Sequence, residues 1–194
     1  MPMFGLARSS AVAGAAALLV AAGVASTARA AAPESDYAYA QFGVGAEYLL
    51  ADFYGRAVAS KQFSGVELAA LRRARFNAGE YLAALSRILS DGAQPVAAAA
   101  DFTFTYPTGT FGSRKSIAKT GLAIEQAALG AYESAAIAVS VPAFREVFAR
   151  VIASTGEHVS VLSRIASGRA VGNSFPDTLT LEAAGDTLDP YFGG

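Results

Sequence analysis

The 194-residue sequence has no cysteine and a single histidine, His158. Without cysteine, neither a disulfide nor a thiolate-bound metal is available, so the candidate metal ligands are carboxylates, one imidazole and tyrosine. One histidine also leaves few ways to pair a nucleophile with a base. Ser160 and Ser163 follow His158, but no acid is placed to complete a triad. The fold must therefore be stabilised by packing, without covalent cross-links.

Charged residues are scarce, at 16% of the chain, and the formal net charge is −1. A nucleic-acid partner is not expected, because such a partner needs a clustered basic face. Arg72, Arg73 and Arg75 form only a short basic cluster, which we interpret as a solvated helix face. The glycine-bearing stretches GVGAEY and TGTFG lack the lysine of a phosphate-binding loop, so nucleotide binding is not expected either.

The N-terminal 30 residues have the pattern of a secretory signal peptide. Arg8 precedes an uncharged run from Ala11 to Ala25, and Ala28 and Ala30 form an A-x-A cleavage site. The run is too short and too rich in glycine and alanine for a convincing membrane span. We expect cleavage near Ala30, a secreted or periplasmic protein, and no membrane span afterwards. The alternative is an N-terminal anchor helix that is never cleaved.

Apolar residues recur at three- and four-residue steps in four later segments, which predicts four amphipathic helices and an all-α fold. Ser64 and Glu67 have the spacing of a capping box at the start of the second helix. Pro142 suits the first turn of the fourth helix, where its missing N–H costs nothing. The predicted helices cover residues 37–60, 64–92, 115–140 and 142–168.

Two segments are not helical in pattern. Residues 94–113 contain the alternating Phe102 and Phe104 followed by Pro107, which predicts an extended crossing between the second and third helices. Residues 169–194 are rich in proline, glycine and aspartate, and we expect them to pack as a C-terminal strap. The predicted organisation is a signal peptide over 1–30, a helical bundle over 31–168 and the strap over 169–194.

The chain also repeats itself. GEYLAALSRI at Gly79–Ile88 returns 77 residues later as GEHVSVLSRI at Gly156–Ile165. Glu47 and Tyr54, in the first predicted helix, return as Glu125 and Tyr132 in the third. The sequence thus predicts two copies of one helical hairpin. The alternative is that alanine-rich helices resemble one another by composition alone. This alternative explains the matching leucine and alanine positions better than the matching glutamate and tyrosine positions.

The stretch FGVGAEYLLADFYGRAV (Phe42–Val58) resembles the opening helix of ferritin-like proteins that include desiccation-related and secreted stress proteins. DFTFTYP in the crossing and NSFPDTLT in the tail are similar to the linker and strap of the same family. The resemblance implies a ferritin-like four-helix bundle with a long crossover between helices 2 and 3. It also implies kinship with di-iron carboxylate proteins and a function that is mostly unassigned.

A ferritin-like di-metal site takes one Glu from each of two helices and a Glu-x-x-His pair from each of the other two. On this chain Glu47, Glu125 and His158 match the pattern. In the fourth helix, Thr155 stands where the pattern has Glu. In the second helix, Ala78 stands where it has Glu and Tyr81 where it has His. Both Glu-x-x-His pairs are therefore broken. Glu80 and Glu157 lie about 100° away from the inner face, and we expect them at the surface.

Two buried carboxylates need a counter-charge or a proton. We favour a metal-free polar cluster that also includes Thr155. In this cluster either His158 is protonated, or Glu47 and Glu125 share a proton and accept hydrogen bonds from Tyr81, Tyr54 and Tyr132. The alternative is a single Fe, Mn or Zn ion bound by the two glutamates and the histidine, with Tyr81 at a vestigial ligand position.

Three functions follow from these readings. The first is an exported, stress-related protein without catalysis, and the second is a one-metal oxidoreductase. The third is an interaction module that buries Phe102, Phe104 and Phe111 against a partner protein or in a homo-oligomer.

Overall fold

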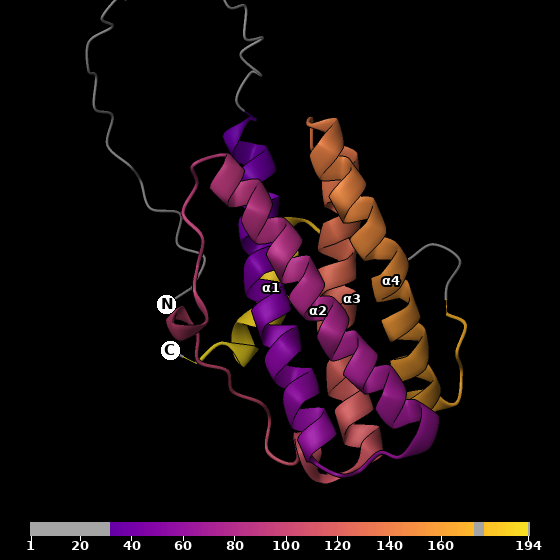
Figure 1. Ribbon diagram of the computed structural model, residues 1–194. Helices are drawn as coiled ribbons and strands as arrows, with labels where there is room; N and C mark the ends of the chain where they lie inside the picture. The colour runs from indigo at the N-terminus through magenta and orange to yellow at the C-terminus, as the bar shows by residue number, and fades with distance from the viewer. Residues whose placement is uncertain (1–31, 173–176, 194) are drawn as a thin grey trace, which may run out of the picture.

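The computed structural model describes residues 32–172 and 177–193, and this part of the chain is almost entirely helical (Figure 1). The predicted signal peptide lies outside the described residues. Four long helices lie side by side: α1 (Glu34–Ala59), α2 (Gly65–Asp91), α3 (Arg114–Ala138) and α4 (Pro142–Ser167). The smaller elements are η1 (Ala99–Asp101), η2 (Thr110–Gly112), α5 (Leu181–Leu188) and η3 (Asp189–Tyr191). The expected all-α bundle with its crossover between α2 and α3 is confirmed.

The helix ends follow local chemistry in most places. Pro142 begins α4, and Gly168 ends it in the left-handed conformation with φ of 82°. Ser113 caps α3 by accepting a hydrogen bond from the Ser116 amide. The predicted capping box at α2 is wrong, because Ser64 makes no side-chain cap. The carboxylate of Glu67 instead pairs with Arg114 at the start of α3.

Another acidic residue supplies a cap across the bundle. Asp36, near the start of α1, is buried, and its Oδ2 accepts hydrogen bonds from the Ser140 amide at 2.9 Å and hydroxyl at 2.8 Å. It also accepts one from the Val141 amide at 3.1 Å. Asp36 therefore fixes the turn between α3 and α4 and places a negative charge at the N-terminus of α4.

Apart from the short turns η1 and η2, the crossing is extended, as predicted, and it pairs with the end of the chain. Phe104 and Phe192 form an antiparallel bridge, and the Gly193 amide donates to the Thr103 carbonyl at 2.7 Å. The tail contains α5, which the strap prediction missed; the Thr180 hydroxyl caps this helix and α5 packs on α3. The aromatic rings of the crossing pack on the chain itself, with Phe102 against Tyr48 and Phe111 against Phe53. Such packing does not favour a role for these rings in binding a partner.

The four long helices are not equally enclosed. α1 and α3 are buried on most sides because they lie against each other, against α2 and α4, and against the crossing and tail. α2 and α4 each bury one stripe and leave the opposite face exposed. Among the described residues, no helix combines the length and apolar character needed to cross a membrane. The bundle therefore encloses α1 and α3 on more sides than α2 and α4.

Candidate functional site

Two glutamates lie in the centre of the bundle, one on each inner helix. Glu47 on α1 is 1% exposed and Glu125 on α3 is 0% exposed. Each stands seven residues before a tyrosine of its own helix, Tyr54 or Tyr132, and seven residues are close to two helical turns. The acid and the tyrosine of each helix therefore share one buried face.

Each tyrosine donates a hydrogen bond to the glutamate of the other inner helix. The Tyr54 hydroxyl donates to Glu125 Oε1 at 2.5 Å, and the Tyr132 hydroxyl donates to Glu47 Oε1 at 2.6 Å. The two bonds are equivalent under the sequence repeat, because each runs from the tyrosine of one copy to the acid of the other. The structure thus joins the two hairpins through a reciprocal pair of buried hydrogen bonds.

His158 lies within hydrogen-bond distance of Glu125 but makes no hydrogen bond to Glu47 within the described residues. Its Nδ1 lies 3.0 Å from Glu125 Oε1, and its Nε2 lies 3.1 Å from the Asn77 side-chain nitrogen. That nitrogen also donates to Ser154 Oγ at 3.1 Å. With the Asn77 amide as donor, Nε2 accepts and the proton lies on Nδ1, which donates to Glu125. Two donors therefore converge on one oxygen of Glu125, an arrangement that suits a carboxylate.

The other predicted positions are also in place. Thr155 and Ala78 are buried, and the Tyr81 ring stacks on His158 with 6.5 Å between centroids. The expected hydrogen bond from Tyr81 is absent: within the described residues, its hydroxyl donates to neither Glu47 nor Glu125. Glu80 and Glu157 are exposed, as predicted from their angular position. Neither replaces the carboxylates that the second and fourth helices lack.

Burial dominates the electrostatics of the site. It raises the pKa of Glu47 well above its usual value; the Tyr132 hydrogen bond opposes this and the nearby Glu125 adds to it. Burial also raises the pKa values of Tyr54 and Tyr132, which keeps both hydroxyls protonated as donors. Glu47 Oε2 and Glu125 Oε2 are buried and have no hydrogen-bond partner among the described residues. These two carboxylate oxygens are unsatisfied acceptors at the centre of the site.

A narrow cleft reaches this cluster from the surface. Its volume is about 90 Å³, and Tyr54, Asn77 and His158 lie along it together with Arg73 and Glu157. A space of this size admits water or a solute of a few atoms. His158 is 8% exposed, so the cluster is enclosed and yet reachable through the cleft.

The fit of a metal can be tested on the donor set. A di-metal centre does not fit, because Ala78, Tyr81 and Thr155 replace three of its ligands. The pair of unsatisfied oxygens and one imidazole would suit a single ion. Within residues 32–172 and 177–193, however, no three acidic or histidine side chains are already arranged to hold one. Binding a single ion would require these side chains to rearrange.

Fold and site together define an α-helical bundle with a buried carboxylate pair contributed by its first and third helices. The chain matches the family model described as the ferritin-like domain over residues 35–167, and it belongs to that family. No curated protein matches the chain.

Sequence reasoning missed two members of the cluster, Asn77 and Ser154. They stand four residues before Tyr81 and His158 and are themselves 77 residues apart, so they occupy equivalent places in the repeat. This repeat offset was the available signal. It went unused because an asparagine and a serine on a helix face give no chemical reason, by themselves, to expect them in the core.

Proposed function

We propose that this protein is an exported ferritin-like protein whose central site is a metal-free, hydrogen-bonded polar cluster without catalytic activity. The observation that carries the proposal is the reciprocal pair of bonds from Tyr54 to Glu125 and from Tyr132 to Glu47. In the cluster, protein donors occupy Oε1 of both glutamates. The donors are tyrosines with raised pKa values, which favour hydrogen bonding over metal ligation.

Export rests on the N-terminal sequence pattern, and a stress-related role rests on the resemblance of Phe42–Val58 to secreted and desiccation-related relatives. In this proposal the protein acts through its stable bundle or its surface. The reciprocal bonds link both hairpins, so they contribute to that stability. Mass spectrometry of the protein from its native compartment tests export, since cleavage near Ala30 is expected to leave a chain that begins near Ala31.

A second function is favoured by one observation. Glu47 Oε2 and Glu125 Oε2 lack partners, and His158 lies beside Glu125, so a single Fe, Mn or Zn ion has three candidate ligands. These residues would hold the ion, and the ion would supply redox or Lewis-acid chemistry to a solute entering through the cleft. Occupying Nδ1 of His158 would require breaking its contact with Glu125.

Metal content decides between the two functions. The protein is purified from its native compartment, loaded with Fe, Mn or Zn, and compared with a His158→Ala variant by elemental analysis. We expect far less than one ion per chain in both. A near-stoichiometric ion that is lost in the variant would overturn the metal-free proposal.

A variant that restores the missing metal ligands provides a positive control. The variant Ala78→Glu/Tyr81→His/Thr155→Glu restores both Glu-x-x-His pairs, and we expect it to bind metal where the parent does not. Its circular dichroism spectrum reports whether the bundle still forms. Metal uptake by the triple variant shows that the loading protocol works, so a negative result for the parent is then informative.

A further inference from the structure

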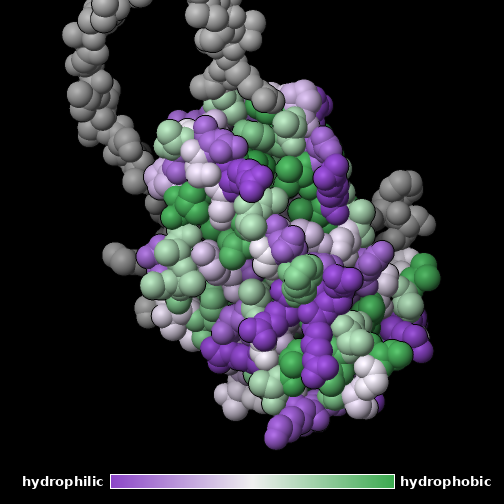
Figure 2. All heavy atoms as spheres, in the orientation of Figure 1, coloured by the Kyte–Doolittle hydropathy of each residue, from purple (hydrophilic) through white to green (hydrophobic). Residues whose placement is uncertain are grey.

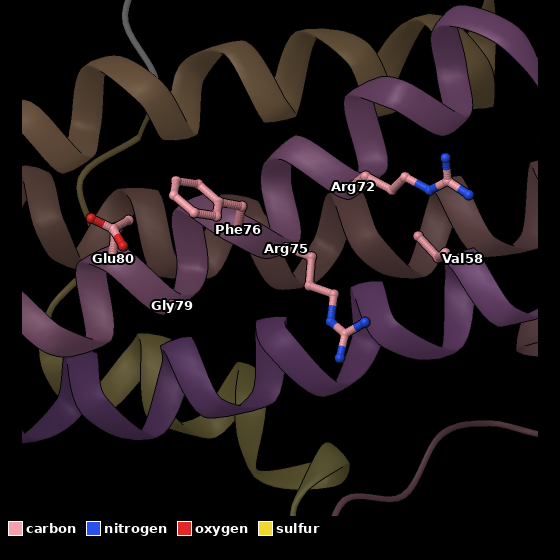
Figure 3. A pocket seen from close by; sticks show the side chains of 6 residues that line it. All are labelled: Val58, Arg72, Arg75, Phe76, Gly79 and Glu80. Carbon is pink, nitrogen blue, oxygen red and sulfur yellow. The ribbon is translucent and has the colours of Figure 1, made fainter.

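The exposed face of α2 carries side chains that the central site does not use. Arg72, Phe76 and Glu80 stand one turn apart along this helix, and Phe76 is 56% exposed. With Val58, Arg75 and Gly79 they line an open hollow of about 550 Å³ beside α1 (Figure 3). Figure 2 shows hydrophilic side chains gathered over the lower part of this view, with apolar side chains among them.

This face has unmet interactions. Neither Arg72 nor Glu80 takes part in an ion pair among the described residues. The guanidinium of Arg73 lies 5.5 Å from the centroid of the Phe76 ring, and more than half of Phe76 remains exposed. Gly79 has open space where a side chain would stand. An exposed aromatic ring beside a notch is typical of a docking surface.

The repeat provides an internal control. The positions equivalent to Arg72, Phe76 and Glu80 on α4 are Ala149, Ala153 and Glu157. The outer face of α4 therefore has the same Glu and the same open glycine, Gly156, but neither the arginine nor the ring. The pattern on α2 belongs to one copy of the hairpin and is not a by-product of the fold.

The order of charges along α2 is self-complementary, which favours a second copy of the chain as the partner at this face. Arg72 lies four residues before Phe76, and Glu80 lies four residues after it, so the three side chains form one row of the i±4 type. When two such rows meet antiparallel about a twofold axis at Phe76, Arg72 of each copy faces Glu80 of the other. The two Phe76 rings meet at the centre, as an isologous interface requires.

We propose that the α2 face is a homodimer interface in which a second copy of the chain docks antiparallel along the Arg72–Phe76–Glu80 row. The interface has an aromatic centre and two reciprocal ion pairs at its sides. This inference is independent of the central cluster, because these side chains point outward from α2.

Sedimentation equilibrium of the purified protein tests the proposal. We expect a concentration-dependent dimer, and we expect Glu80→Arg and Arg72→Glu each to raise the dissociation constant at least about tenfold. Phe76→Ala removes the central ring and is expected to weaken the dimer by a similar factor. The matched control, Glu157→Arg on α4, is expected to leave association unchanged.

Charge exchange makes the test specific. A mixture of Glu80→Arg and Arg72→Glu chains places opposite charges at both pairs, so we expect it to form a heterodimer with near wild-type affinity. A wild-type protein that stays monomeric at about 100 µM, where even a micromolar dissociation constant gives dimer, would overturn the proposal. So would a wild-type dimer that the charge variants leave intact, or a mixture that does not associate.

Discussion

At the central site, the two hairpins carry the same residues on their inner helices and different residues at the matching positions of their outer helices. On α1 and α3 the Glu and Tyr of one copy match those of the other, and each tyrosine bonds the opposite acid. On α2 and α4 the matching places hold Tyr81 and His158. The two reciprocal bonds require the Glu and the Tyr of both hairpins, whereas a residue on α2 or α4 changes the hydrogen bonding only of the glutamate beside it. The consequence is an unequal pair, with two donors on Glu125 and one on Glu47.

The largest effect is expected from removing the better-bonded acid. Glu125→Leu leaves the Tyr54 hydroxyl and the His158 N–H buried without acceptors, and we expect a loss of about 3–5 kcal/mol in the free energy of unfolding. Glu47→Leu leaves only the Tyr132 hydroxyl unpaired and is expected to cost about 1–3 kcal/mol. Urea denaturation of both variants measures the difference. Equal losses would contradict the inequality of the two acids.

The tyrosines are expected to differ in the opposite sense. Tyr132→Phe leaves Glu47 with no hydrogen bond on either oxygen, and we expect a cost of about 2–3 kcal/mol. Tyr54→Phe leaves Glu125 bonded to His158 and is expected to cost about 1–2 kcal/mol. Thermal and urea denaturation report both values. A greater loss for Tyr54→Phe would show that His158 does not support Glu125.

The pH dependence of stability tests the environment of Glu47. Its pKa is raised in the folded state, so the folded protein holds this proton more tightly than the unfolded chain. The contribution is fully present below the usual value of 4.5 and is lost as pH rises toward and through the folded pKa. The slope for one proton is at most about 1.4 kcal/mol per pH unit.

Glu47→Gln is the matched variant, because an amide resembles the protonated acid in shape and carries no charge. We expect it to cost less than about 1 kcal/mol near neutral pH and to flatten the decline of stability above pH 4.5. Urea titrations at several pH values compare the two proteins. An unchanged slope in the variant would assign the pH dependence to other groups.

A similarly small effect on stability is expected at Asn77. Asn77→Ala removes the donor to His158 Nε2, at a cost of about 0.5–1.5 kcal/mol. The single histidine of the chain makes ¹⁵N NMR of the imidazole unambiguous. We expect the wild-type protein to show the Nδ1–H tautomer and the variant to shift the Nε2 resonance. A resonance that does not move would mean that Asn77 does not bond His158 in solution.

Local pattern was enough to predict much of this molecule. The three- and four-residue period placed the four long helices to within three residues at every end, because a helix that buries one stripe must repeat its apolar residues at that step. The same period, with the repeat, directed Glu47, Glu125 and His158 inward and Glu80 and Glu157 outward. The prediction of a capping box at Ser64 was wrong because the Glu67 carboxylate pairs with Arg114, which lies 47 residues away in the sequence. α5 was missed because its eight residues lie in a tail rich in turn-forming residues.

The sequence by itself determined which faces of the helices are buried, that one hairpin occurs twice, and that Glu47 and Glu125 enter the core. These properties depend on spacing along a single helix, and spacing is visible in the letters. Only the tertiary structure decided that each tyrosine bonds the acid of the other copy, that Asn77 bonds His158, and that Asp36 caps α4. These contacts depend on how helices distant in sequence are rotated and packed against one another, and no local period encodes that relation.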